Sequence, residues 1–422
     1  MFKTRITLPR IRCPLVAAFA CIVGVLSPPC SPLAHGQTYT VLDSFGGTNG
    51  ANPYGSLILS GSTLYGVTAN GGANGSGAIF SESVAGGSPT SLFSFDTSNG
   101  AYPYGSLILS GSTLYGMTNS GGANGLGTIF SEPTPGGAPT TLFSFDSSNG
   151  ASPRGSLILS GSTLYGMTQS GGASGDGAVF SESVAGGAPT ILASFGGANG
   201  STPIGSLVLS GSTLYGMTHG GGTSGLGTIF SEPVAGGAPT VLASFNYTNG
   251  SNPSGSLILS GSTLYGMTYS GGADGLGTIF SEPVAGGAPT TLFSFDDTNG
   301  SHPNGSLILS GSTLYGTTYS GGANGDGTLF SEPLTGGTPT ILVSFTGNSG
   351  SYPGAHPEGD LLLSGSTLYG MTLSGGTDGE GVIFADNLPT PEPPSWLSFL
   401  VFAAIIGAIH WRRQRRKAAA SA

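Results

Sequence analysis

The sequence predicts an all-β protein, a seven-bladed β-propeller of four-stranded antiparallel blades. Two observations lead to this prediction: a sequence motif that recurs at a fixed period, and four short apolar runs within each copy. The first six copies of a short motif begin fifty residues apart, and the last step is 54 because the segment 351–358 carries four extra residues. A fixed period of this length, built from short apolar runs, is typical of propellers. The motif is Gly-Ser-Thr-Leu-Tyr-Gly, which begins at Gly61, Gly111, Gly161, Gly211, Gly261, Gly311 and Gly365.

Each copy contains four apolar runs, which in the second copy are 106–110, 113–118, 128–131 and 140–145. The runs are rich in β-branched and aromatic residues and are bounded by Gly, Pro, Asn or Ser, as strands are. No stretch of the repeats exceeds ten residues without Gly or Pro, so helices are not expected. The innermost run of the first copy, 57–59, is entirely apolar, which indicates burial on both faces by neighbouring blades.

The two ends of the repeat array predict a closed ring. Residues 38–45 match the fourth run of a copy, but they precede the first complete copy. The last copy has its first three runs, 360–364, 367–372 and 381–385, and no fourth run before Pro389. We therefore expect the N-terminal strand to complete the last blade, within a propeller that covers residues 37–388.

Charge and cysteine usage exclude several classes of function. Of the ten Lys and Arg residues, Arg154 alone lies in the predicted propeller, against nineteen acidic residues, which leaves a formal charge of −18. Such a surface repels phosphate, so no nucleic-acid partner is expected. All three cysteines precede residue 37, so the propeller has no disulfide, thiol nucleophile or cysteine metal site.

Residues 1–36 have the pattern of a secretory signal peptide. A basic start, Lys3 to Arg12, precedes an apolar stretch and the small residues Ala34 and Gly36. This pattern predicts export and cleavage between Gly36 and Gln37.

The C-terminal residues indicate sorting at the membrane. A linker, 389–395, contains Pro391, Glu392 and Pro393; an apolar span, 396–411, follows and has Trp at each margin. A basic tail, 412–422, closes the chain and is expected to be cytoplasmic. Its cationic residues include Arg412, Arg413, Arg415 and Arg416.

This order of motif, apolar span and basic tail resembles the PEP-CTERM sorting signal of Gram-negative bacteria. The resemblance implies recognition by an exosortase-type enzyme, cleavage near the Pro-Glu-Pro motif, transient anchoring in the inner membrane, and delivery to the outer surface or the extracellular matrix. A plain membrane anchor is the alternative.

The repeats resemble the GloVer tandem repeat family. The resemblance rests on Leu-Tyr-Gly, on the Gly-Gly pair between the second and third runs, and on Gly-Thr-Ile-Phe of the third run, over nearly all of 37–388. It brings no established activity with it. Kelch repeats are similar in length but have a blade tryptophan that is missing here, so kelch proteins are a structural analogy only.

The differences between copies predict where a ligand would bind. They concentrate in the loops before the first run and after the second run of each copy, which emerge on the same face of a propeller. Tyr interspersed with Asn and Asp suits sugar recognition there, because rings stack on sugar faces while amides and carboxylates bond to the hydroxyls. Loops on a rigid scaffold also often carry function. Random drift of unconstrained loops is the alternative. The candidate ligand face consists of Tyr54, Tyr102, Tyr104, Arg154, His219, Tyr269, His302 and Tyr319.

A carboxylate closes the third run of every copy. These side chains could line a channel mouth or bind cations, or each could cap its own turn or face water. The residues are Glu82, Glu132, Glu182, Glu232, Glu282, Glu332 and Asp386.

The glycine-rich loops lack the helix and lysine of a phosphate site and the spacing of an EF-hand. No cofactor is expected, and calcium in these loops is an alternative to plain turn geometry.

No catalytic constellation can be named from spacing, and near-identical blades favour a protein that is not an enzyme. The sequence therefore predicts an exported binding or structural propeller of the envelope or the exopolysaccharide matrix. The alternatives are a polysaccharide-active hydrolase or lyase that uses axial acids, and a spacer without a ligand.

Overall fold

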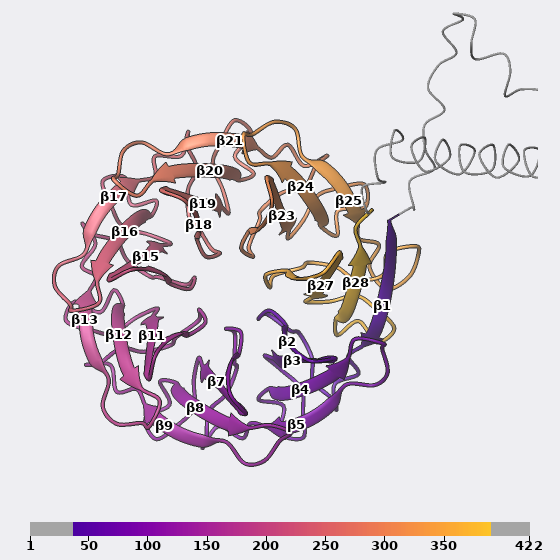
Figure 1. Cartoon of the computed structure of the whole chain (residues 1–422), viewed down its shortest axis with the longest axis horizontal. Coiled ribbons are helices and arrows are strands. Elements are labelled where there is room, and N and C mark those ends of the chain that lie inside the picture. Colours follow the sequence, from indigo (N-terminus) through magenta and orange to yellow (C-terminus); the bar gives the residue numbers. More distant parts are fainter. Residues whose placement is uncertain (1–36, 390–422) are drawn as a thin grey trace, which may run out of the picture. The chain divides into compact units, whose positions relative to one another are not determined.

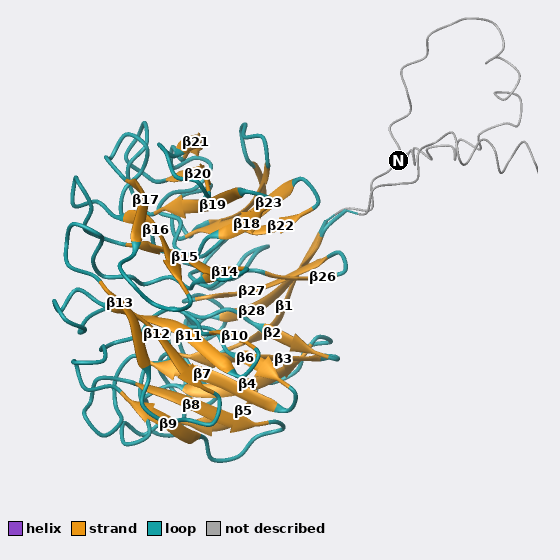
Figure 2. Ribbon diagram, turned by 60° about the vertical axis from the view of Figure 1, so that its left-hand side comes forward, coloured by secondary structure: helices purple, strands orange, loops and turns teal. Residues whose placement is uncertain are grey.

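The computed structural model describes residues 37–389 and confirms the predicted fold class. Seven four-stranded antiparallel sheets stand as blades around one axis (Figure 1). Within the described residues the chain forms strands and loops but no helix (Figure 2).

The first three blades follow the chain order of their strands. Blade 1 holds β2 (Ile58–Ser60), β3 (Thr63–Thr68), β4 (Ala78–Ser83) and β5 (Thr90–Ser94). Blade 2 holds β6 (Ile108–Ser110), β7 (Thr113–Thr118), β8 (Thr128–Pro133) and β9 (Thr140–Ser144). Blade 3 holds β10 (Ile158–Ser160), β11 (Thr163–Thr168), β12 (Ala178–Ser183) and β13 (Thr190–Ser194).

The next three blades repeat this arrangement. Blade 4 holds β14 (Val208–Ser210), β15 (Thr213–Thr218), β16 (Thr228–Pro233) and β17 (Thr240–Ser244). Blade 5 holds β18 (Ile258–Ser260), β19 (Thr263–Thr268), β20 (Thr278–Pro283) and β21 (Thr290–Ser294). Blade 6 holds β22 (Ile308–Ser310), β23 (Thr313–Thr318), β24 (Thr328–Pro333) and β25 (Thr340–Ser344).

Blade 7 closes the ring as the sequence predicts. It combines β26 (Leu362–Ser364), β27 (Thr367–Thr372) and β28 (Val382–Asn387) with β1 (Thr38–Ser44), in the order β1-β28-β27-β26. Strand β1 pairs antiparallel with β28, with Thr38 opposite Asn387. The two ends of the propeller are thus hydrogen-bonded to each other.

The side chain of Gln37 substitutes for a loop that blade 7 lacks. In blades 4 and 5 the loop between the third and fourth strands donates a backbone N–H to the preceding blade, as from Gly237 to the Leu192 carbonyl at 2.9 Å. The chain of blade 7 has no such loop, because its fourth strand comes from the other end of the sequence. There the amide of Gln37 donates to the Leu342 carbonyl at 3.0 Å and to Asp386 Oδ2 at 2.7 Å.

The core lies between the blades. A phenylalanine that follows the fourth strand of one blade packs against a phenylalanine in the third strand of the next, with ring centroids 5.0–5.5 Å apart. All of these rings are buried. Burial of aromatic surface is a large favourable contribution to folding, so the apolar contacts between blades stabilise the closed ring. The pairs are Phe45–Phe80, Phe95–Phe130, Phe145–Phe180, Phe195–Phe230, Phe245–Phe280, Phe295–Phe330 and Phe345–Phe384.

The glycine of the Leu-Tyr-Gly motif is required by this packing. A Cβ atom on Gly116 would lie 2.6 Å from Phe130 Cζ and 3.0 Å from Leu107 Cδ2. We expect Gly116→Ala to lower the free energy of unfolding by about 1–3 kcal/mol through overpacking, measured by urea denaturation of the full chain.

Gly287→Ala is the matched control, because its Cβ would meet no atom closer than 3.6 Å. An equal loss of stability in both variants would contradict the steric explanation.

Candidate functional site

A ring of hydrogen bonds fixes the backbone around the axis. The N–H of each serine that precedes a first strand donates to the equivalent side chain of the next blade, at 2.6–2.8 Å. Asp360 takes the serine's place in blade 7: it accepts from Ser306 and donates its own N–H to Ser56 Oγ, which closes the ring. The ring surrounds an axial pocket of about 80 Å³ that residues from all seven blades line.

The side chains two positions before these serines form an inner ring at the axial pocket. The inner ring differs in every blade but two, and consists of Tyr54, Tyr104, Arg154, Ile204, Ser254, Asn304 and Glu358.

A second ring lies two residues earlier in each blade and has left-handed backbone. Its φ angles are 51–57°, and none of its members is glycine. Each N–H donates to a carbonyl of the preceding blade at 2.8–2.9 Å, and each carbonyl accepts from the loop after the second strand at 3.1–3.3 Å. This left-handed ring consists of Asn52, Tyr102, Ser152, Thr202, Asn252, His302 and His356.

The residues that donate to those carbonyls form an outer ring, in the loop directly after the second strand of each blade. They are Ala69, Asn119, Gln169, His219, Tyr269, Tyr319 and Leu373. In all three rings the backbone is repeated in every blade while the side chains vary.

All eight residues of the predicted ligand face belong to these rings, and several are in contact. The rings of Tyr54 and Tyr104 have centroids 4.8 Å apart, and Arg154 Cζ lies 4.9 Å from the centroid of Tyr104. Tyr269 lies beside His302, with centroids 4.8 Å apart. The loops before the first strands and after the second strands therefore share one face, as the sequence predicts.

The variable face is hollowed over blades 3 to 6. The hollow encloses about 480 Å³, and no carboxylate lines it. Its lining combines one guanidinium, amides, hydroxyls, an imidazole, a phenol ring and one aliphatic side chain. The lining residues are Arg154, Gln169, Thr202, Ile204, His219, Asn252, Ser254, Tyr269, Ser270 and Asn304.

His219, which lines this hollow, is held in place by its neighbours. The Nδ1 atom of His219 lies 3.4 Å from the Pro253 carbonyl. The side-chain amide of Asn252 donates a hydrogen bond to the backbone carbonyl of His219 at 3.1 Å. Burial, and more weakly the nearby charge of Arg154, hold the pKa of His219 below its usual value. The imidazole is therefore neutral at neutral pH.

Glu358 is a further functional candidate, which the sequence pattern did not reveal. It accepts a hydrogen bond from Asn304 Nδ2 at 2.6 Å. Burial raises the pKa of Glu358 to about 7, although Arg154 and Asn304 both act to lower it. The four-residue insertion hides this position, because Glu358 comes into register with Tyr54 only after the insertion is subtracted.

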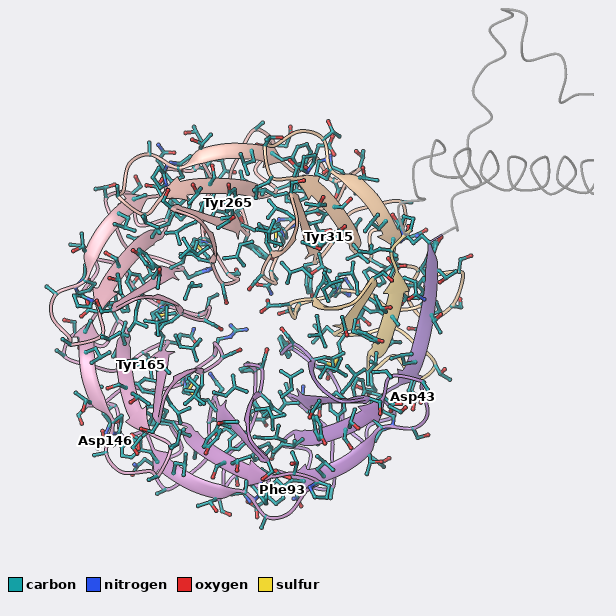
Figure 3. The ribbon with its side chains drawn as sticks, viewed as in Figure 1. Asp43, Phe93, Asp146, Tyr165, Tyr265 and Tyr315 are labelled. Atoms are coloured by element: carbon teal, nitrogen blue, oxygen red, sulfur yellow. The ribbon has the colours of Figure 1, made fainter. Side chains whose placement is uncertain are left out.

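The seven repeated carboxylates are buried, so two predictions for them are wrong: they neither line the channel mouth nor face water. Each is at most 3 % exposed, and none is among the residues that line the axial pocket. Glu82 lies near Asp43, which Figure 3 shows toward the rim of the ring, away from the axis. In the sheet Glu132 lies opposite Leu114, within the blade. The position of each carboxylate is set by its place in the third strand of the blade and not by the loop that follows.

Few polar groups contact these buried carboxylates. No well-aligned hydrogen bond reaches the six glutamates, although backbone N–H groups of Ser83, Gly137 and Gly337 act against burial on the pKa of Glu82, Glu132 and Glu332. One oxygen of Asp386 accepts a hydrogen bond from Gln37. Burial raises the pKa of each glutamate to about 7 and also raises the pKa of Asp386. They are separate along the ring, and within residues 37–389 no group of three or more His, Cys, Asp or Glu side chains could hold a metal ion.

The comparisons identify the repeats. The model of the Gloeobacter/Verrucomicrobia repeat family matches residues 32–230 and 185–384, which together are most of the chain. The chain belongs to this repeat family. Membership confirms the GloVer-type resemblance, and the described residues give the family's repeat the form of a propeller blade. No curated protein matches the chain.

Solved structures resemble this chain at low sequence identity. A puromycin-hydrolyzing peptidase of Mycobacterium tuberculosis has a TM-score of 0.50 and 14% identity, over 81% of this chain and 53% of its own. A putative 6-phosphogluconolactonase of Bacteroides uniformis has a TM-score of 0.47 and 17% identity, over 75% and 88%. A chain of a nidogen/laminin complex has a TM-score of 0.42 and 17% identity, over 64% and 89%. At 14% identity the likeness to the peptidase concerns the fold alone.

The targeting predictions fall outside the described residues. The signal peptide with Gly36, the Pro391-Glu392-Pro393 motif, the span 396–411 and the basic tail are not among them. Within residues 37–389 the structure contains no helix of the length and apolar character that membrane crossing needs.

Proposed function

We propose that this protein is an exported binding propeller that an exosortase-type system sorts to the cell surface or the extracellular matrix, and that its variable face binds a glycan of the envelope or the exopolysaccharide. The export and sorting parts of the proposal rest on the signal-like residues 1–36 and the C-terminal motif. The binding part rests on the three rings.

The left-handed ring is the observation that carries the proposal. A non-glycine residue at positive φ costs on the order of 1–3 kcal/mol, and such strain is concentrated at binding and active sites. At another left-handed position of the same loops, glycine occupies three of seven copies, Gly47, Gly197 and Gly347. In the left-handed ring no copy uses glycine. Side chains are thus retained where glycine would relieve strain, which favours a use for them over drift.

The chemistry of the face suits a saccharide. Aromatic rings can stack on the apolar faces of sugars, and amides and hydroxyls can bond to sugar hydroxyls. Tyr102 is 38 % exposed on the left-handed ring, and Tyr269 lines the hollow. Such pockets, with aromatic surface and a few directed polar groups, are typical of small-molecule sites.

The other blades supply substitutions that the backbone already accepts. Tyr102→Asn, Tyr104→Ser and Tyr269→Gln place in one blade the residue that another blade has at the same position, as Asn52, Ser254 and Gln169. We expect the triple variant to bind polysaccharide fractions from the source cells at least about tenfold more weakly, because the stacking surface is lost. Calorimetric titration of the full chain, in a detergent without a sugar headgroup, measures this.

Tyr247→Thr is the control, since Tyr247 is 51 % exposed but lies outside the three rings and Thr97 has the equivalent position. Saturable binding that the triple variant retains would overturn the assignment of the face. The absence of binding to any fraction, with calcium or with chelator, would favour a spacer.

The hydrolase or lyase alternative gains no specific support from the axial acids. Glu358 accepts a hydrogen bond from Asn304, and Asp360 accepts one from the Ser306 N–H as part of the axial ring. Turnover of a glycan by the purified protein would favour that alternative.

A further inference from the structure

Arg154 is the one cation of the propeller, and it lies where the axial pocket and the hollow meet, because it lines both. It is half-buried. Within residues 37–389 no carboxylate forms an ion pair with it, and its guanidinium lies over the ring of Tyr104, with Cζ 4.9 Å from the centroid. A guanidinium presents five donors in a rigid fork that matches a carboxylate.

The acid of the inner ring, Glu358, accepts a hydrogen bond from Asn304 and forms no ion pair with Arg154. Glu358 is bonded to Asn304, which lines the hollow, and its raised pKa of about 7 leaves a large fraction of the carboxyl protonated at neutral pH. Asp176 shares a loop with Gln169 and Asp274 shares one with Tyr269, but neither of these acids lines the hollow. The hollow thus offers one local positive charge on a protein that is otherwise strongly acidic.

The groups around Arg154 match the rest of a sugar ring. Tyr269 supplies an aromatic face, Ile204 an aliphatic contact, and Asn252 an amide, all within the same hollow. About 480 Å³ is enough for a short oligosaccharide segment.

From this arrangement we propose that the hollow over blades 3 to 6 binds an acidic saccharide, a uronic acid residue whose carboxylate contacts Arg154. The inference rests on the proposed glycan-binding function and names its ligand class. A charge-assisted, bidentate hydrogen bond is strong where solvent is partly excluded. A neutral sugar would leave the guanidinium unpaired and would therefore bind less tightly.

The test compares acidic oligosaccharides with their uncharged counterparts. The probes are tetrasaccharides of galacturonic, glucuronic and mannuronic acid, each paired with its carboxyl-reduced form, which keeps the sugar stereochemistry and lacks the charge. Calorimetric titration of the full chain at pH 6.5 should show at least one uronide that binds about tenfold or more tightly than its reduced form.

Two variants assign the effect to the arginine. Arg154→Asn should abolish the preference for the acidic saccharide. This variant is expected to fold, because Asn304 occupies the same position in blade 6. Arg154→Lys should restore part of the preference, because the charge returns without the planar fork. Tyr247→Thr, at an exposed position outside the three rings, should leave the preference unchanged.

The outcomes separate this inference from the proposed function. Binding of uncharged and acidic saccharides with equal affinity, or a preference that survives Arg154→Asn, would overturn the role of Arg154 and leave a glycan-binding face. Binding of no saccharide, acidic or neutral, and of no polysaccharide fraction would overturn both.

Discussion

Truncation of Phe45 to alanine is expected to lower the free energy of unfolding by about 3–5 kcal/mol, as for a fully buried core aromatic. The side chain is 0 % exposed and packs on Phe80 of blade 1, with ring centroids 5.1 Å apart. Although Phe45 lies near the start of the propeller, it fills the same place between two blades as every other member of the aromatic pairs. Urea denaturation of the full chain, followed by near-ultraviolet circular dichroism, measures the loss.

Phe195→Ala is the matched control, because Phe195 makes the equivalent contact with Phe230 between two blades in the middle of the chain, with centroids 5.0 Å apart. A closed ring requires similar losses at the two sites. If Phe45→Ala cost much less than Phe195→Ala, the first strand would not be held in blade 7. Deletion of residues 38–45 should then also be harmless, whereas closure predicts that it removes the cooperative transition.

The second large effect is a loss of stability as the pH rises. Burial raises the pKa of each repeated glutamate from 4.5 to about 7 in the folded protein, so the folded state binds more protons than the unfolded state between these values. The contribution of these protonated carboxyls to the free energy of unfolding is therefore fully present below about pH 4.5. It is lost as the pH rises through about 7.

We expect the urea midpoint of the full chain to be highest near pH 5 and to fall steadily toward pH 8. Replacement of all six glutamates by glutamine should flatten this fall, because an amide of similar shape cannot ionise. Glu132→Gln alone should reduce the slope by a fraction. The quantity to compare is the change of the urea midpoint with pH, and not the midpoint at one pH. A buried amide without partners lowers the stability equally at every pH, so it shifts the midpoint without changing this slope.

Asp146→Asn serves as the control for this experiment. Asp146 is exposed on the outer rim, and a hydrogen bond from Ser148 holds its pKa below the usual value (Figure 3). Its contribution is lost only in acid, so the slope between pH 5 and 8 should not change. A midpoint that stays constant or increases from pH 5 to pH 8 in the parent protein would show that the carboxylates are solvated or paired.

Much of the fold could be predicted from local pattern. The fifty-residue period, the turn residues and the displaced strand 38–45 predicted seven blades and their closure, and the structure confirms both. The variable loop positions also predicted the face on which Tyr54, Arg154 and His219 lie. Repetition made this possible, since differences between copies stand out against an otherwise constant scaffold.

The burial of the carboxylates could not be predicted in this way. In sequence, Glu132 ends an apolar run before Pro133 and reads as a turn or surface residue. The strand continues through Pro133, and the loop that follows packs close to the preceding blade, as Gly136 does near Leu92. Whether a strand end is covered depends on the neighbouring blade, and a single copy of the repeat carries no information about that contact.

The sequence by itself determined the number of blades, the strand that closes them and the face where the copies differ, because these follow from the period and from turn chemistry. Only the tertiary structure decided which of the varying side chains meet. Arg154, Ile204 and Asn304 are fifty or more residues apart, yet they line one hollow because the blades turn around a common axis. It also decided that the seven carboxylates lose their water, since that depends on the packing of one blade against the next.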